Sequence, residues 1–212
     1  PFLHINFIFL HIFYHHRTDP ETPLEETMAA LNLMVKQGKA LYIGISNYKP
    51  AEVKKAIRIL KELGTPCLIH QPKYSMLERW VEDGLLDLLE TEGVGCIPFS
   101  PLAQGMLTDK YLNGIPDDSR VKKGLGFLST KHITQDKIEL AGKLNEMAMR
   151  SSQSLAQMAL AWILKDKRIT SVLIGASKPE QVTASVQCLQ NLNFTQEELT
   201  DIENLLSLRA KM

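Results

Sequence analysis

The sequence lacks an excess of charge of either sign and is poor in cysteine. Its 24 Lys and Arg residues balance 24 Asp and Glu residues, whereas a nucleic-acid-binding protein is expected to carry a basic excess. The three cysteines are odd in number and widely spaced, so they match no zinc or disulfide pattern. We therefore expect no nucleic-acid partner and no metal site, and reduced thiols in a cytoplasmic protein.

Several recognisable motifs are also missing. The chain has no G-x-G-x-x-G or Walker loop for nucleotide phosphates, no G-x-S-x-G nucleophile elbow and no carboxylate pair for glycoside hydrolysis. Its very apolar first segment, residues 1–14, has no Lys or Arg for a signal peptide and is shorter than the roughly 20 residues of a membrane helix. We expect no membrane insertion. Because the chain starts at Pro1 rather than Met, we expect it to be a piece of a longer protein.

What is present is the composition of an ordinary globular domain. Hydrophobic residues make up 44% and charged residues 23% of the 212 positions, which argues against a disordered chain, a coiled coil and a fibrous repeat. One domain is the default at this length.

Helix signals alternate with short apolar runs along the chain. Strands are expected at residues 12–14, 41–45, 67–69, 95–99 and 170–174. Helices are expected at residues 24–37, 50–63, 81–91, 134–150 and 154–165, with two more starting near 179 and 196. This alternation predicts an α/β protein with a parallel sheet of five βα units, and both a doubly wound sheet and a (β/α)₈ barrel fit it.

Capping boxes mark four of the expected helix starts. They pair Thr22 with Glu25, Ser154 with Gln157, Ser177 with Glu180 and Thr195 with Glu198, with Pro23 at the first helical position. The long irregular stretch at residues 101–133 is typical of a functional or mobile loop.

Polar residues follow the expected strands. They are His15-His16-Arg17, Ser46-Asn47, Gln71, Ser100 and Gly175-Ala176-Ser177. In both candidate folds the carboxyl ends of the strands form the site. Hydroxyl and amide groups suit a neutral polar ligand edge such as a carboxamide, and the residues alone leave the ligand open.

Five ordered segments resemble the aldo-keto reductases, in particular the L-glyceraldehyde 3-phosphate reductase type, to which potassium-channel β-subunits are related. They are IFYHHR (12–17), GKALYIGISN (38–47), HQPKYS (70–75), PFSPLAQGMLT (98–108) and GASKPEQ (175–181). The resemblance implies a partial (β/α)₈ TIM barrel holding strands four to eight of the family barrel. Residues 12–212 would be the C-terminal part of the domain, and residues 1–11 an atypical lead-in.

The resemblance also implies site residues. His16 matches the family's catalytic histidine after the fourth strand, while no position matches its catalytic Asp, Tyr and Lys. His15 should point to the opposite face of the strand and is interpreted as structural. Ser46, Asn47 and Gln71 resemble the residues that bind the nicotinamide carboxamide of NADPH, although turn and capping roles explain Ser46 and Asn47 as well.

Further cofactor contacts are implied in two later segments. The first holds Phe99, Ser100, Pro101, Leu102, Gln104 and Gly105, with Lys110 and Arg120 beyond it. The second holds Gly175, Ser177, Lys178 and Gln181, placed at a helix N-terminus that would attract the adenosine 2′-phosphate. Ala184-Ser185 replace a common Glu-Asn of the family, which puts adenine recognition in doubt.

The implied activity is reduction of a small-molecule carbonyl, such as L-glyceraldehyde 3-phosphate or a methylglyoxal-like compound, by NADPH. The chain alone is expected to be weak or inactive. A non-enzymatic regulatory subunit resembling potassium-channel β-subunits and a non-functional gene fragment are the alternatives. Open sheet edges predict aggregation or self-association, which leaves a homo-oligomer open.

Overall fold

The computed structural model describes residues 10–116, 122 and 133–209. Arg120 lies outside these residues. The chain divides into two compact units. The sheet unit comprises Pro1–Lys73, Trp80–Ile97 and Arg168–Ser171, and the helical unit comprises Tyr74–Arg79, Pro98–Lys167 and Val172–Met212.

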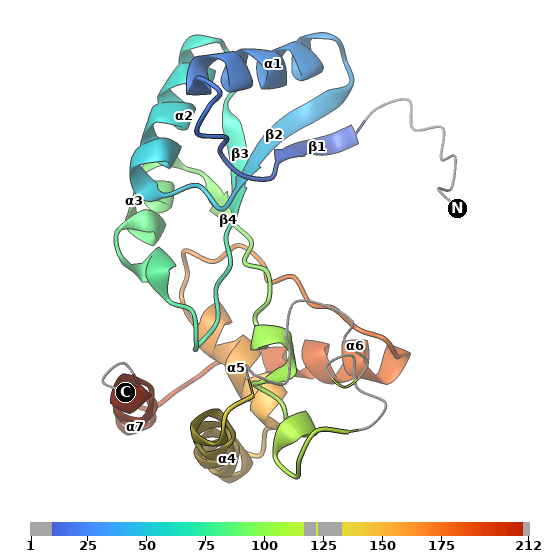
Figure 1. Cartoon of the computed structure of the whole chain (residues 1–212), viewed down its shortest axis with the longest axis vertical. Helices are drawn as coiled ribbons and strands as arrows, with labels where there is room; N and C mark the ends of the chain where they lie inside the picture. Colours follow the sequence, from blue (N-terminus) through green and yellow to red (C-terminus); the bar gives the residue numbers. More distant parts are fainter. Residues whose placement is uncertain (1–9, 117–121, 123–132, 210–212) are drawn as a thin grey trace. The chain divides into compact units, whose positions relative to one another are not determined.

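Parallel strands alternate with helices in the sheet unit, as predicted. The strands β1 (Leu10–His15), β2 (Ala40–Ser46), β3 (Cys67–Gln71) and β4 (Gly95–Cys96) lie side by side in that order (Figure 1). The connections contain α1 (Leu24–Lys36), α2 (Pro50–Glu62), the 3₁₀ turn η1 (Trp80–Glu82) and α3 (Leu85–Glu92). α1 packs on β2, α2 on β3 and α3 on β4, so the helices cover one face of the sheet.

The core of the sheet unit lies between the sheet and these helices. Ile43 and Ile45 of β2 and Leu60 of α2 are buried there, and each such side chain contributes roughly 1.5–3 kcal/mol. Because side chains alternate along a strand, Tyr42 and Gly44 belong to the other face. Tyr42 is 49% exposed, so that face carries apolar surface in contact with solvent.

A close approach of Tyr14 explains the glycine in the middle of β2. A Cβ atom added at Gly44 would lie 2.5 Å from Cε1 and 2.7 Å from Cδ1 of Tyr14. Tyr14 is the register partner of Gly44 in the neighbouring strand. The tyrosine ring therefore occupies the space of the missing side chain.

The predicted strand at residues 170–174 is wrong, and the one at 95–99 is shortened to two residues. Thr170 N–H donates to the Cys96 carbonyl at 2.8 Å, and Leu173 N–H donates to the Pro98 carbonyl at 2.9 Å. The bonds in return are missing, because Pro98 has no N–H and Cys96 N–H donates to the Thr170 hydroxyl. Residues 170–174 are thus extended but form no ladder, and Leu173 is 40% exposed.

The predicted helix at residues 81–91 is interrupted. Gly84 adopts a left-handed conformation (φ 79°) between η1 and α3. Only a residue without a Cβ atom takes this conformation readily, so the glycine separates a 3₁₀ turn from the α-helix.

Two of the four capping boxes are confirmed and two are wrong. Ser154 with Gln157 and Thr195 with Glu198 each exchange both hydrogen bonds. Thr22 instead donates to Asp19 at 2.7 Å, and α1 starts after Pro23, which is therefore outside the helix. At the start of α6 (Pro179–Val186), Gln181 takes the role predicted for Glu180.

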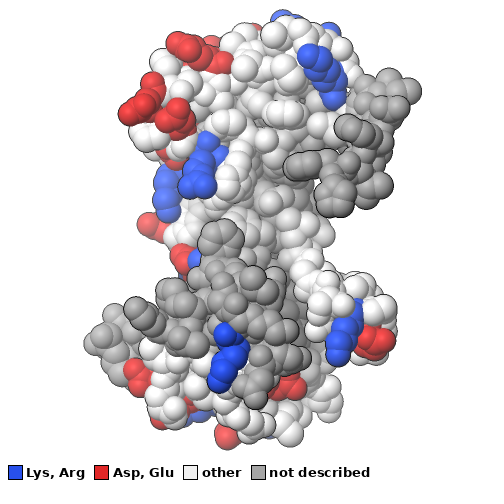
Figure 2. All heavy atoms as spheres, turned by 45° about the vertical axis from the view of Figure 1, so that its right-hand side comes forward, with Lys and Arg blue, Asp and Glu red and all other residues white. Residues whose placement is uncertain are grey.

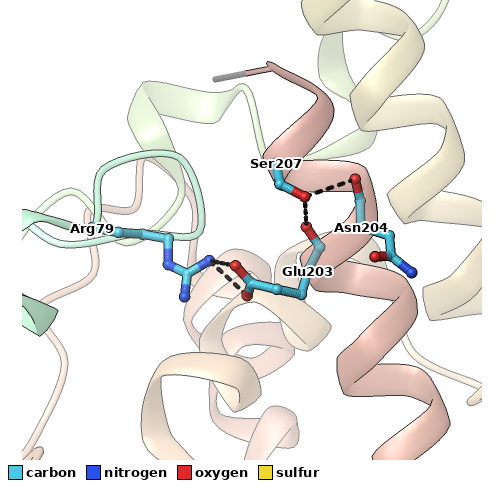
Figure 3. A network of polar contacts seen from close by, with 4 residues as sticks. All are labelled: Arg79, Glu203, Asn204 and Ser207. Carbon is cyan, nitrogen blue, oxygen red and sulfur yellow. Dashed lines mark hydrogen bonds and ion pairs between the residues drawn. The ribbon is translucent and has the colours of Figure 1, made fainter. Parts of the chain in front are cut away.

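The helical unit contains α4 (Gln135–Arg150), α5 (Leu155–Leu164), α6 and α7 (Gln196–Arg209), with 3₁₀ turns η2 (Ala103–Gly105), η3 (Asp109–Tyr111) and η5 (Gln187–Gln190). Two cations lie over the ring of the buried Trp162 of α5, with Arg79 5.2 Å and Lys165 4.5 Å from its centroid. Figure 3 shows one guanidinium nitrogen of Arg79, Nη1, donating to both carboxylate oxygens of Glu203, at 2.8 and 2.7 Å. This pair fastens α7 to the segment 74–79.

Among the described helices, none is both long and apolar enough to span a membrane. On the face drawn in Figure 2, acidic and basic side chains are scattered and do not gather into one basic area.

Candidate functional site

Four of the predicted site residues meet at one edge of the sheet unit. β1, β2 and β3 are neighbours, so their carboxyl ends bring His16, Ser46, Asn47 and Gln71 together. The Ser46 hydroxyl donates to the Gln71 carbonyl at 2.6 Å. The Asn47 amide donates to the Ser46 hydroxyl at 3.1 Å and to the His16 carbonyl at 3.4 Å. A continuous chain of hydrogen bonds thus links three strand ends.

Burial differs sharply along this chain of bonds. Ser46 is 3% exposed, Asn47 and Gln71 are half-buried, and His16 is exposed. Asn47 has a left-handed backbone (φ 58°), which asparagine tolerates better than most residues. This conformation ends β2 and lets the amide reach back to the loop after β1.

His15 and Tyr48 form a pair beside these residues, and Tyr48 was not predicted from the sequence. The Nδ1 atom of His15 lies 2.6 Å from the Tyr48 hydroxyl, with the rings edge-on at 5.8 Å. Burial lowers the pKa of His15, with a further contribution from His16, and burial raises the pKa of Tyr48. The contact is a hydrogen bond in which the tautomer of His15 decides which group donates.

Tyr14 is a second residue that sequence reasoning missed. It lies on the same face of the sheet as Gly44 and Ser46. Burial raises the pKa of Tyr14, and a hydrogen bond with the Gln71 side chain opposes the shift. A tyrosine directly before the histidine pair is a weak signal, because strands are rich in aromatic residues.

In the helical unit, the predicted loop at residues 99–105 has an unusual backbone. Ser100 (φ 56°), Ala103 (φ 47°) and Gln104 (φ 60°) all have positive φ without being glycine. Such residues cost on the order of 1–3 kcal/mol each and cluster at ligand sites. Pro101 is buried and Gln104 is exposed. The other predicted residues of the loop are partly buried: Phe99, Ser100, Leu102 and Gly105. Lys110, in η3, is exposed, with its Nζ atom 5.7 Å from the Tyr111 ring centroid.

The second predicted segment of the helical unit surrounds the N-terminus of α6. The N–H groups of Ser177 and Lys178 point to one oxygen, Oε1 of Gln181, at 2.8 and 3.3 Å. Gly175 precedes them in the extended stretch. Ala184 and Ser185 form hydrogen bonds within the helical unit. The Ala184 carbonyl accepts from the Gln157 amide at 3.0 Å, and the Ser185 hydroxyl donates to the Gln181 carbonyl at 2.7 Å.

The comparisons with known proteins point to one family. The model of the aldo/keto reductase family matches residues 9–207. An L-glyceraldehyde 3-phosphate reductase of Escherichia coli K12 is 53% identical over 199 residues, which are 92% of this chain and 58% of the relative. A probable voltage-gated potassium channel subunit beta of Oryza sativa is 32% identical over 208 residues, covering 96% of this chain and 63% of the relative.

A solved structure gives the same result. A thermostable aldo-keto reductase in complex with the inhibitor epalrestat superposes with a TM-score of 0.68 and is 25% identical, covering 93% of this chain and 60% of the other. The chain thus spans 58% to 63% of the length of these two curated relatives. Its fold is that of the TIM-barrel-like α/β reductases, while the assignment of its strands to particular strands of the barrel stays a prediction. The chain belongs to the aldo/keto reductase family.

Proposed function

We propose that this chain forms the NADPH-holding and carbonyl-polarising part of a reductase that acts on small aldehydes or ketones such as L-glyceraldehyde 3-phosphate. The proposal rests mainly on the chain of hydrogen bonds at neighbouring strand ends, which links Ser46, Asn47, Gln71 and His16. The 53% identity to an L-glyceraldehyde 3-phosphate reductase supports this substrate class.

The strand-end groups have the chemistry that a carboxamide needs. Ser46, Asn47 and Gln71 carry a hydroxyl and two amides, which both donate and accept hydrogen bonds. A carboxamide presents one carbonyl oxygen and two N–H groups, and therefore complements them. We assign these three residues to the nicotinamide end of NADPH.

The N-terminus of α6 has the chemistry that a phosphate needs. Two N–H groups already converge on the Gln181 oxygen, so they are oriented toward an acceptor. Lys178 adds a positive charge, and the dipole of α6 favours an anion at this end. We assign Ser177, Lys178 and Gln181 to the 2′-phosphate, and the loop 99–105 with Lys110 to the remaining phosphates.

When bound, NADPH supplies the hydride for reduction. His16, exposed after β1, donates an N–H to the carbonyl oxygen and polarises the bond. The proton that completes the alcohol comes from a general acid. The family's catalytic Tyr matches no position among these 212 residues, so that step belongs to a group outside them.

Fluorescence titration with NADPH and NADH tests the cofactor assignment. Lys178→Glu should weaken NADPH binding at least about tenfold more than NADH binding, because only NADPH carries the extra phosphate, whose attraction to a lysine is lost on charge reversal. Lys143→Glu, a charge reversal at an exposed position of α4, is the matched control and should leave both affinities unchanged. Equal losses for both cofactors in Lys178→Glu would refute the assignment of the 2′-phosphate.

A further inference from the structure

One short segment of the sheet unit forms all the hydrogen bonds described below to the loop that carries His16. This segment, residues 46–52, runs from the last residue of β2 through the connection at residues 47–49 into the first turn of α2. The bonds join His15 to Tyr48 at 2.6 Å, the His16 carbonyl to Asn47 at 3.4 Å and Thr18 to Glu52 at 2.9 Å. Three of the four residues 15–18 are therefore held from one place, on both sides of His16.

The Tyr48 side of this arrangement is anchored in the core. Tyr48 is fully buried, so its ring cannot follow a movement of the loop. Its hydroxyl is also the hydrogen-bond partner of the half-buried Nδ1 atom of His15, and a buried polar atom without a partner is costly. Movement of the end of β1 would therefore break a bond that water does not readily replace.

The Glu52 side is anchored in the first turn of α2. One carboxylate oxygen of Glu52 accepts from the Thr18 hydroxyl, and the other accepts from the Lys49 N–H at 2.7 Å. Hydrogen bonds to an ionised carboxylate are roughly twice as strong as neutral ones. The same residue thus caps a helix and holds the loop two residues after His16.

We infer that Tyr48 and Glu52 are positioning residues for His16, holding the backbone on either side of it through His15 and Thr18. Only the role of His16 rests on the proposed function; the restraint itself is a property of the sheet unit. Neither residue matches the family's catalytic positions, and neither is expected to touch substrate or cofactor.

Nuclear magnetic resonance of the whole chain without cofactor tests the inference. Tyr48→Phe removes only the hydroxyl, and Thr18→Val removes only the bond to Glu52 while leaving the cap of α2 intact. Tyr42→Phe, at an exposed position of β2, is the matched control, and Thr18→Ser should rescue the loop because it keeps a hydroxyl. The ¹⁵N signal of His15 Nδ1 reports the bond to Tyr48, and backbone order parameters report the restraint.

In Tyr48→Phe the His15 Nδ1 signal should shift. In the double variant that combines Tyr48→Phe with Thr18→Val, the order parameter of His16 should fall from about 0.85 toward about 0.6. Tyr42→Phe and Thr18→Ser should change neither signal. A double variant that melts at a lower temperature with an unchanged His16 order parameter would show a purely structural role and overturn the inference. Failure of NADPH to bind would overturn the proposed function and leave this result standing.

Discussion

His70 makes the stability of the sheet unit depend on pH. Its side chain is fully buried at the end of β3, and neither ring nitrogen has a hydrogen-bond partner among the described residues. Burial lowers the pKa of His70 from 6.5 to about 4, and a contact with the Tyr48 backbone that falls short of hydrogen-bond geometry opposes the shift. Between these two pH values His70 is therefore protonated in the unfolded chain and neutral in the folded chain.

The sign and size of the effect follow from this difference. The free energy of unfolding has its full value above pH 6.5 and falls as the pH drops toward 4. Below pH 4, His70 causes no further loss. One pKa unit corresponds to about 1.36 kcal/mol, so the full loss is about 3 kcal/mol, of which about 2 kcal/mol has occurred by about pH 5. For a domain of ordinary stability this is a large fraction of the total.

Urea unfolding at four pH values from neutral down to the folded-state pKa measures the effect in the wild type and in His70→Leu. The leucine side chain fills a similar volume and cannot be protonated, so its unfolding free energy should fall by about 2 kcal/mol less between about pH 7.5 and about pH 5. Leu41→Gln, at an exposed position of β2 without a titratable group, serves as control and should keep the wild-type dependence on pH. Parallel profiles for the wild type and His70→Leu would refute the reasoning.

Three further predictions concern packing, activity and association. Gly44→Ala should cost about 1–3 kcal/mol in urea unfolding because its methyl group collides with Tyr14, whereas Gly142→Ala, in open space on α4, should stabilise by about 0.5–1 kcal/mol. NADPH oxidation by the 212-residue chain with L-glyceraldehyde 3-phosphate should stay near background. The reason is the unmatched general acid, which typically contributes about 10²–10⁴-fold to the rate. Turnover near one per second, which lies in the ordinary enzyme range of about 1–10³ per second, would contradict this prediction. Among the described residues β1 is an edge strand of the sheet. This edge should cause self-association in sedimentation velocity, and a single monomeric species at high concentration would count against it.

The parallel sheet was predictable because its signals are local. Apolar runs, turn glycines and the Pro50 helix start all lie within a few residues of the elements that they define. The strand expected at 170–174 failed for a non-local reason. Its partner segment contains Pro98, whose missing N–H prevents a ladder, and a composition of β-branched residues cannot reveal the neighbour.

The candidate site was predictable only in part. Motifs identified Ser46, Asn47 and Gln71 because their order along the chain is specific, and the structure brings them together. Tyr48 escaped because an aromatic residue beside a turn is usually core, and nothing in the sequence shows that its hydroxyl meets His15. Contacts between residues 33 positions apart require the fold itself.

Gln181 makes any binding at the start of α6 an exchange reaction. Its amide oxygen already accepts from two N–H groups, so an incoming ligand must displace it rather than fill free donors. A neutral hydroxyl would replace one weak acceptor with another and leave the balance nearly unchanged. A doubly charged oxyanion forms stronger hydrogen bonds to the two N–H groups and therefore favours displacement of the Gln181 oxygen. This helix end thus selects ligands by their charge more than by their number of acceptors.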